Sequence, residues 1–184
     1  MRRRCAGLSL AELVVVLGMV AAMAAIAAPD LHGMVRGQQL RTAASDLHSA
    51  IQLTRSQAIA RNRQVKLAPN DPAGRDWSQG WTVFLDRDND RQPGEGDEVL
   101  AVHRPLPSGM QVSYSFTSPA APQYIAYNGA GRSCSDTNGA GARLGTLSLL
   151  HGGQARRIKI NMLGRPRLCN PARDGGCDGA AAPP

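Results

Sequence analysis

The chain begins with one long apolar run that limits what its N-terminal part can become. Residues 8–28 are 21 residues with Glu12 as the only charged side chain, and they directly follow Cys5-Ala-Gly and three arginines at positions 2–4. A helix of that length is on the order of 30 Å long, enough to cross the hydrocarbon core of a bilayer. Arginines before such a helix favour the cytoplasmic side. The run therefore predicts a single-pass inner-membrane helix over 8–28, with everything after it in the periplasm.

A cleaved secretory signal is the alternative interpretation of the same run. A basic start, an apolar stretch and small residues at Ala25 and Ala27 are typical of a signal-peptidase site. Cleavage there would leave a soluble secreted domain. Glu12 favours the retained helix, because a carboxylate inside a membrane costs a few kcal/mol unless it is paired and is usually kept for a purpose.

Residues 7–12, Gly-Leu-Ser-Leu-Ala-Glu, carry a family resemblance. A basic leader ending in glycine, with glutamate at the fifth position after it, resembles the prepilin signal of type IV pilins and type II secretion pseudopilins. In that family a prepilin peptidase cuts after the glycine and methylates the new N-terminus. The resemblance implies removal of residues 1–7, cleavage after Gly7 and methylation of Leu8, where the family usually has Phe. Pro29 stands where pilins commonly carry a helix-kinking proline.

Glu12 has an expected role in assembly. If these helices pack together in a filament, its carboxylate can pair with the N-terminal ammonium of Leu8 in a neighbouring subunit, which removes two buried charges at once. Such a pair would set the axial register of the filament. The alternative is that Glu12 only reaches toward the cytoplasmic interface. The partners implied are other pilins or pseudopilins, the prepilin peptidase and the inner membrane.

The pattern changes beyond the apolar run. Over 29–62 apolar residues recur at three- and four-residue steps, as at Leu40, Ala43, Leu47 and Ile51, which predicts the amphipathic second half of the same helix. Short strand-like runs follow at 65–68, 81–85, 99–103, 112–116, 124–127, 146–150 and 156–160. The sequence predicts an α+β, pilin-like fold: a long N-terminal helix packed on an antiparallel sheet or sandwich, a β-rich domain over 63–170 and a flexible tail over 171–184.

Further motifs narrow the resemblance. Residues 41–47, 53–62, 80–86 and 127–132 and the Gly-Arg-Pro-Arg sequence of 164–167 follow one another in an order that is similar to the GspH/FimT group of minor pilins and pseudopilins. This resemblance spans nearly the whole chain. It implies a structural protein, and no nucleophile or general-base motif of an enzyme is found in the sequence.

Charge is unevenly distributed along the chain. Residues 67–103 hold three arginines against eight carboxylates, whereas residues 137–173 hold six arginines and one lysine with no acid. A segment with cations only indicates an anionic partner. Because side chains alternate along a strand, Arg157 and Lys159 should share one face, with Arg156, Ile158 and Ile160 on the other.

The basic segment points to DNA. In the FimT branch the Gly-Arg-x-Arg motif is associated with DNA binding in natural transformation, so the resemblance implies that Arg165 and Arg167 contact DNA. Charge alone adds Arg143, Arg156, Arg157 and Lys159. Aromatic residues make up only 4% of the chain, so contact should be to the phosphate backbone, non-specific and strongly salt-dependent. In the alternative, a type II secretion minor pseudopilin, the basic segment would pair with the acidic 67–103 of the next subunit without binding DNA.

The cysteines predict a disulfide. Cys5 leaves with the leader, and Cys134, Cys169 and Cys177 remain for an oxidising compartment. The pair is Cys169–Cys177 or Cys134–Cys169. Neither spacing suits zinc, and no metal or cofactor is expected.

The acidic run from Asp86 to Asp90 is similar to half of a calcium loop. Arg91 stands where such a loop needs glycine. A solvated hairpin turn between two strands is the preferred interpretation, with calcium as the alternative.

Overall fold

A computed structural model describes residues 9–118 and 120–179, with the surroundings of side chains described outside 24–31. In this part of the chain, one long helix, α1 (Leu10–Arg61), precedes eight β-strands. The chain divides into two units, Met1–Arg36 and Gly37–Pro184. Each is described separately below.

The first unit is the N-terminal part of α1. Ser9 caps the helix: its Oγ accepts a hydrogen bond from the Glu12 backbone N at 3.2 Å and its carbonyl accepts one from Leu13 N at 3.2 Å. The apolar side chains of 10–23 are exposed. Among the described residues, no helical stretch has the length and apolar character that crossing a membrane requires.

Three residues predicted for processing or assembly lie wholly or partly outside the described residues. Gly7 and Leu8 lie outside the described residues. Pro29 is within the backbone of α1, but its side chain belongs to the part that is not described. Cleavage, methylation and the filament role of Glu12 therefore stay predictions.

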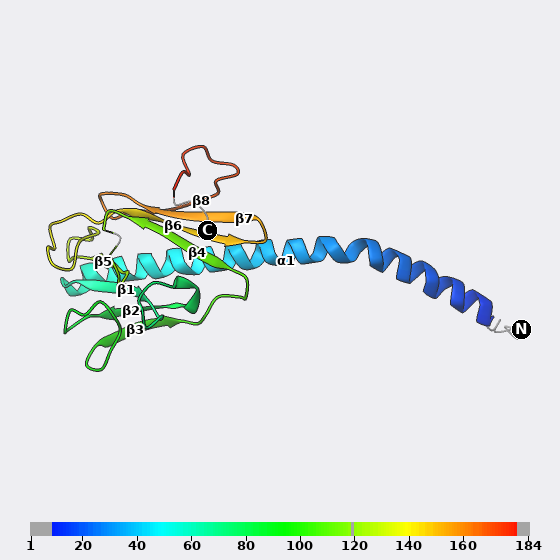
Figure 1. Cartoon of the computed structure of the whole chain (residues 1–184), viewed down its shortest axis with the longest axis horizontal. Helices are drawn as coiled ribbons and strands as arrows, with labels where there is room; N and C mark the ends of the chain where they lie inside the picture. Colours follow the sequence, from blue (N-terminus) through cyan, green and yellow to red (C-terminus); the bar gives the residue numbers. More distant parts are fainter. Residues whose placement is uncertain (1–8, 119, 180–184) are drawn as a thin grey trace, which may run out of the picture. The chain divides into compact units, whose positions relative to one another are not determined.

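The second unit contains the core. It has two four-stranded sheets in which all neighbouring strands are antiparallel, ordered β3-β2-β1-β5 and β4-β6-β7-β8. The first sheet consists of β1 (Val65–Pro69), β2 (Trp81–Leu85), β3 (Glu98–His103) and β5 (Ile125–Tyr127), and a short 3-10 helix η1 (Trp77–Gln79) precedes β2. The second consists of β4 (Gln111–Phe116), β6 (Gly145–His151), β7 (Gln154–Ile160) and β8 (Pro166–Cys169). From Gly37 on, α1 lies between the two sheets (Figure 1).

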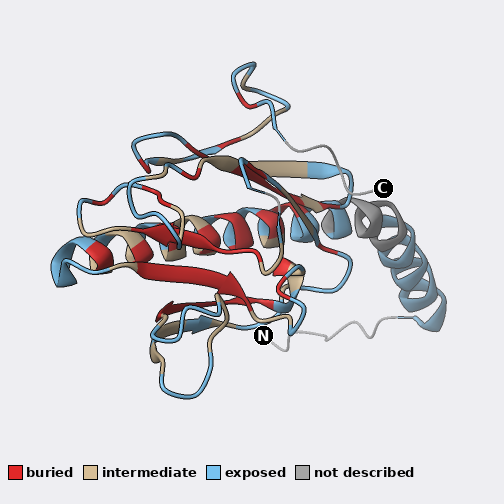
Figure 2. Cartoon of the chain, turned by 60° about the vertical axis from the view of Figure 1, so that its left-hand side comes forward, coloured by how far each residue is buried: buried red, intermediate tan, exposed pale blue. Residues whose placement is uncertain are grey.

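The amphipathic pattern of the helix determines this arrangement. Leu40, Ala44, Leu47, Ile51 and Ala58 are fully buried on α1, and Figure 2 shows this buried stretch between the sheets. They form one core with side chains of both sheets, among them Val65, Leu67, Val83, Ile125, Leu147, Leu149, Ile158 and Ile160. The predicted fold class, a long helix packed on antiparallel strands, is confirmed.

The helix ends where the backbone turns left-handed. Asn62 has a φ of 48°, and the backbone N of Arg63 donates to the carbonyl of Ala58 at 3.2 Å. This hydrogen bond closes the last turn and satisfies a carbonyl that the helix itself leaves open. The predicted end of the helix at residue 62 is therefore correct to within one residue.

One strand differs from expectation. No strand is predicted after residue 160, so the Gly-Arg-Pro-Arg motif is expected in a loop, but Pro166 begins β8, which pairs with β7 in the register Lys159 to Arg167. Proline lacks a backbone N–H and is tolerated at the first residue of an edge strand, where that donor is not needed. β8 is the edge strand of its sheet.

The first sheet is also buried on its outer face. Lys66, 1% exposed, lies there beside a second apolar cluster that includes Phe84 and Tyr124. Its Nζ donates to Asp86 Oδ2 at 2.6 Å and to Asn89 Oδ1 at 2.7 Å. Burial opposes ionisation of Asp86, but Lys66 and two backbone amides outweigh it, so the pKa of Asp86 lies below its ordinary value.

Candidate nucleic-acid interface

The hairpin of β7 and β8 positions most of the predicted cations. Ile158 and Ile160 point into the core, so Arg157 and Lys159 lie on the opposite face of β7, as predicted from the alternation. Asn161 organises the turn, because its Oδ1 accepts hydrogen bonds from the backbone N of Leu163 at 3.0 Å and of Arg165 at 2.9 Å. The turn places Arg165 directly before the first residue of β8.

Gly164 holds this turn against the body of the domain. It is buried with a φ of 72°, and a Cβ at this position would lie 2.6 Å from Ser133 N and 2.9 Å from Gly131 O. The carbonyl of Gly131 in turn accepts a hydrogen bond from Arg55 Nε at 2.9 Å. The motifs 127–132 and 164–167 are thus in contact, and the close packing between them requires a glycine at position 164.

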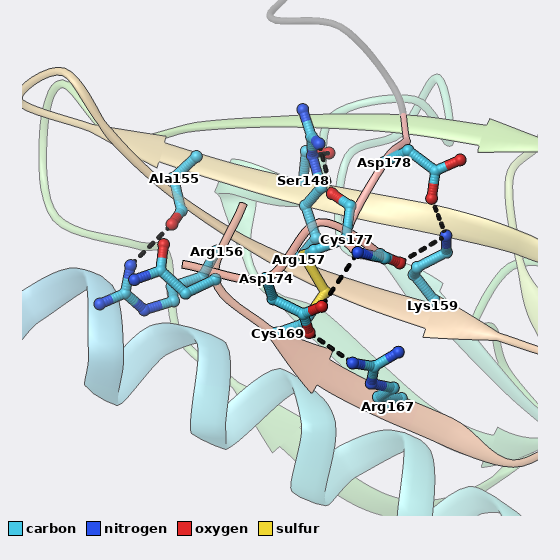
Figure 3. The surroundings of a disulfide bond; sticks show 12 residues. Ser148, Ala155, Arg156, Arg157, Lys159, Arg167, Cys169, Asp174, Cys177 and Asp178 are labelled. Atoms are coloured by element: carbon cyan, nitrogen blue, oxygen red, sulfur yellow. Dashed lines mark hydrogen bonds and ion pairs between the residues drawn. A yellow bond between two sulfur atoms is a disulfide. The ribbon is translucent and has the colours of Figure 1, made fainter. Parts of the chain in front are cut away.

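The segment after β8 is tied down by the predicted disulfide. Cys169 and Cys177 are bonded, with their Cα atoms 5.9 Å apart, while Cys134 is buried and reduced. The alternative pair Cys134–Cys169 is not formed. Arg157 Nη1 donates to the Cys177 carbonyl at 2.6 Å, and Lys159 Nζ donates to the Gly176 carbonyl at 3.2 Å (Figure 3). Residues 171–179 were expected in a flexible tail; instead these bonds close them into a loop against β7.

Two of the predicted cations have carboxylate partners in this loop. Lys159 pairs with Asp178, and Arg167 pairs with Asp174, as Figure 3 shows. The cation-only segment of the sequence, residues 137–173, ends directly before Asp174, and Asp178 follows four residues later. Arg165 is exposed, and among the described residues no carboxylate pairs with it. The basic surface is therefore smaller than the sequence suggests.

Arg143 does not belong to a basic surface, and its prediction as a DNA contact is wrong. The side chain is buried, 3% exposed, and stacks over the Tyr124 ring at 3.9 Å from the guanidinium carbon to the ring centroid. It donates to the carbonyl oxygens of Tyr124 and Ser118. Burial lowers the pKa of Arg143. Its guanidinium fixes loops inside the domain and cannot reach a phosphate.

Arg156 lies on the other side of β7 from Arg157, toward α1 (Figure 3). There it lines a hollow of about 470 Å³ together with Arg41 of α1 and Arg173 of the loop after β8. Neither Arg41 nor Arg173 is among the DNA contacts predicted from the sequence. No sequence signal links these arginines, because more than a hundred residues separate the first from the other two.

The acidic stretch after β2 uses its carboxylates within the loop. Oxygens of Asp86, Asp88 and Asp97 lie within 4.8 Å of one another. Asp86 is paired with Lys66, and Asp97 accepts the backbone N–H groups of Arg87 and Gly94, both at 2.9 Å. The predicted hairpin connection between two strands is present, since β2 pairs directly with β3.

Comparison with known proteins identifies the family. The profile of the family described as Type II transport protein GspH matches residues 43–164, more than half of the chain. The chain belongs to the GspH family. It is thus a minor pilin or pseudopilin, in agreement with the resemblance found in its sequence, and the members of this group are structural proteins. The match ends at residue 164, so Arg165 and Arg167 lie beyond it.

Solved structures share the fold of this GspH-family chain. The type IV minor pilin FimU of Pseudomonas aeruginosa superposes with a TM-score of 0.57 at 15% identity, covering 76% of this chain and 94% of FimU. The minor pseudopilin EpsH from the type 2 secretion system of Vibrio cholerae gives a TM-score of 0.52 at 16% identity, covering 72% of this chain and 98% of EpsH. No curated protein matched the chain in sequence.

Proposed function

We propose that this chain is a FimT-like minor type IV pilin that assembles into or primes a pilus and binds duplex DNA without sequence preference, in support of DNA uptake during natural transformation. The observation that carries the proposal is the exposed Arg165 at the head of β8, with no carboxylate partner in the described structure and two residues from the exposed Arg167. A planar guanidinium matches two phosphate oxygens, so two such groups on a held turn suit a DNA backbone.

The same proposal includes processing at the membrane. The chain would be cut after Gly7, methylated at Leu8 and held in the inner membrane by residues 8–28 until assembly, with Glu12 available to pair with a neighbouring N-terminus. Mass spectrometry of the native protein from a membrane fraction is expected to find a chain that begins at a methylated Leu8. A chain that begins near Ala28 would support a cleaved secretory signal and contradict the filament role.

DNA binding is expected to depend on the two arginines of the motif. In the full chain, purified in a non-ionic detergent, replacing Arg165 and Arg167 with alanine should weaken binding of a short labelled duplex about tenfold or more near physiological salt. The slope of log K against log salt should fall by about 1 for each phosphate contact removed. Fluorescence anisotropy at several salt concentrations measures both quantities.

Two further variants sharpen this experiment. Asp174→Asn and Asp178→Asn should tighten binding, because each removes a negative charge and releases the cation paired with it, Arg167 or Lys159. Arg104→Ala removes an exposed arginine from another part of the domain and serves as the control. If the Arg165 and Arg167 variant retains the affinity and salt slope of Arg104→Ala, the assignment of these residues is wrong.

A type II secretion minor pseudopilin is the second candidate. Two observations favour it: the matched family is described as a type II transport protein, and Lys159 and Arg167 are paired with acids of their own loop. In this case the domain would have a structural role and no DNA ligand. Deletion of the gene separates the two candidates, since one predicts loss of transformation and the other loss of protein secretion.

A further inference from the structure

Three arginines, and no acid among the described residues, line the hollow between α1, β7 and the loop after β8. Arg41 comes from the helix, Arg156 from the strand and Arg173 from the loop, and the remaining lining residues are Gly153, Gln154, Ala155, Asn170, Pro171 and Ala172. Neither Arg41 nor Arg173 has a carboxylate partner among the described residues. Arg156 donates from Nη1 to the Ala155 carbonyl at 2.7 Å, which holds its guanidinium at the hollow.

These cations affect one another. Burial, and then the positive charges of Arg41 and Arg173, lower the pKa of Arg156. Like charges held together without a counter-charge oppose folding, so the cluster does not stabilise the domain. It resembles a preformed anion site, in which the missing negative charge is supplied by a ligand.

The loop that contributes Arg173 has a fixed conformation. Asn170 begins a turn. Its carbonyl oxygen accepts a hydrogen bond from the backbone N of Arg173 at 3.0 Å, and its Oδ1 accepts one from the backbone N of Ala172 at 3.2 Å. The adjacent Cys169 is bonded to Cys177, which closes the loop. The hydrogen-bonded turn and the disulfide therefore fix the position of Arg173 at the hollow.

The hollow and Arg165 lie at opposite ends of β8. Arg165 precedes Pro166, and the lining residues Asn170 to Arg173 follow Cys169. A strand of this length spans roughly 13 Å, over which one DNA strand presents about four phosphates. The separation along β8 is therefore no longer than a few nucleotides of one DNA strand.

We propose that the hollow formed by Arg41, Arg156 and Arg173 is a phosphate-binding subsite for the backbone of duplex DNA, separate from the Gly-Arg-Pro-Arg motif. This inference rests on the proposed DNA binding. The subsite supplies three guanidinium groups that pair with no carboxylate in the described part of the chain, whereas Lys159 and Arg167 must first separate from Asp178 and Asp174. It adds to the salt-dependent affinity that Arg165 and Arg167 contribute.

The test is binding of a short labelled duplex to the full chain in a non-ionic detergent across a series of salt concentrations. The variant Arg41→Ala, Arg156→Ala, Arg173→Ala is expected to bind at least about tenfold more weakly, with a clearly smaller salt slope. The control Arg63→Ala, Arg75→Ala, Arg104→Ala removes the same charge from exposed positions elsewhere and should stay within about threefold of the native chain.

Each outcome has a defined meaning. If the native chain binds and the hollow variant behaves like the control, the subsite is wrong while the proposed function stands. If the native chain does not bind DNA at all, the proposed function fails and this inference fails with it. Loss of binding to phosphatidylglycerol vesicles, with DNA binding unchanged in the hollow variant, would also overturn the subsite and assign it to lipid.

Thermal unfolding separates binding from folding. Because three like charges repel one another, their replacement should leave the Tm unchanged or raise it, unlike replacement of residues that hold the fold. A lower Tm would show that the cluster is structural and overturn the proposal. The milder variant Arg156→Gln, which keeps the length and polarity of the side chain, should still weaken DNA binding severalfold.

Discussion

Replacement of Lys66 by methionine is expected to lower the free energy of unfolding by about 3–5 kcal/mol. Both Lys66 and Asp86 are buried, each side chain 1% exposed, and the lysine is the only cation paired with that carboxylate among the described residues. Without it, Asp86 would keep an uncompensated charge at the outer face of the first sheet, and Asn89 would lose the hydrogen bond that it accepts from Lys66 Nζ. Urea unfolding followed by Trp fluorescence measures the change, because Trp77 and Trp81 are both buried.

Two variants place this result in context. Lys66→Met combined with Asp86→Asn removes both charges and keeps a side-chain oxygen that can accept a backbone N–H of the loop, so it should recover part of the loss, since most of the cost of Lys66→Met comes from the unpaired buried charge. Arg61→Met breaks an exposed pair with Glu98 and should change stability by no more than about 1 kcal/mol. If Lys66→Met costs as little as Arg61→Met, the buried pair does not carry the stability assigned to it.

Replacement of Gly164 by alanine is expected to destabilise the domain by about 2–5 kcal/mol. Two penalties add at this position. The φ of 72° disfavours any residue with a Cβ, and that Cβ would lie 2.6 Å from the backbone N of Ser133, which cannot move without shifting the adjacent loop. Thermal or urea unfolding of the full chain gives the size of the effect.

Gly153→Ala is the matched control for Gly164→Ala. Gly153 has a φ of 75°, but nothing lies within 4 Å of a Cβ there, so only the backbone penalty of about 1–2 kcal/mol applies. The difference between the two variants is the contribution of the packing. Equal effects would mean that the contact between the turn and the loop of 127–132 is unimportant, and with it the structural explanation for the glycine of the motif.

Much of the fold was predictable because the helix and most strands follow from the spacing of apolar residues within short segments. The apolar positions of the helix reappear as its buried face, and the seven predicted strand segments coincide with β1 to β7 to within two residues. β8 was missed because its four residues begin with a proline and an arginine, which do not form a strand pattern on their own. The strand depends on its pairing with β7, a contact that only the folded chain provides.

The candidate site was predictable only in part. Arg165 and Arg167 are exposed at the predicted motif, and the disulfide joins Cys169 to Cys177. Arg143 has the same charge and was grouped with them, yet it is buried over the Tyr124 ring. Counting charges along a sequence assumes that each one reaches solvent, and a single aromatic neighbour from a distant segment can invalidate that assumption.

The sequence by itself determined the order of the elements, the buried face of the helix and the family, because these depend on periodicity and on short motifs that can be recognised without knowing what lies nearby. Tertiary structure alone decided which cations are neutralised and which are grouped. Asp174 and Asp178 fold back onto Arg167 and Lys159, while Arg41 joins Arg156 and Arg173 across more than a hundred residues. Electrostatic interaction depends on distance in space, which separation along the chain does not give.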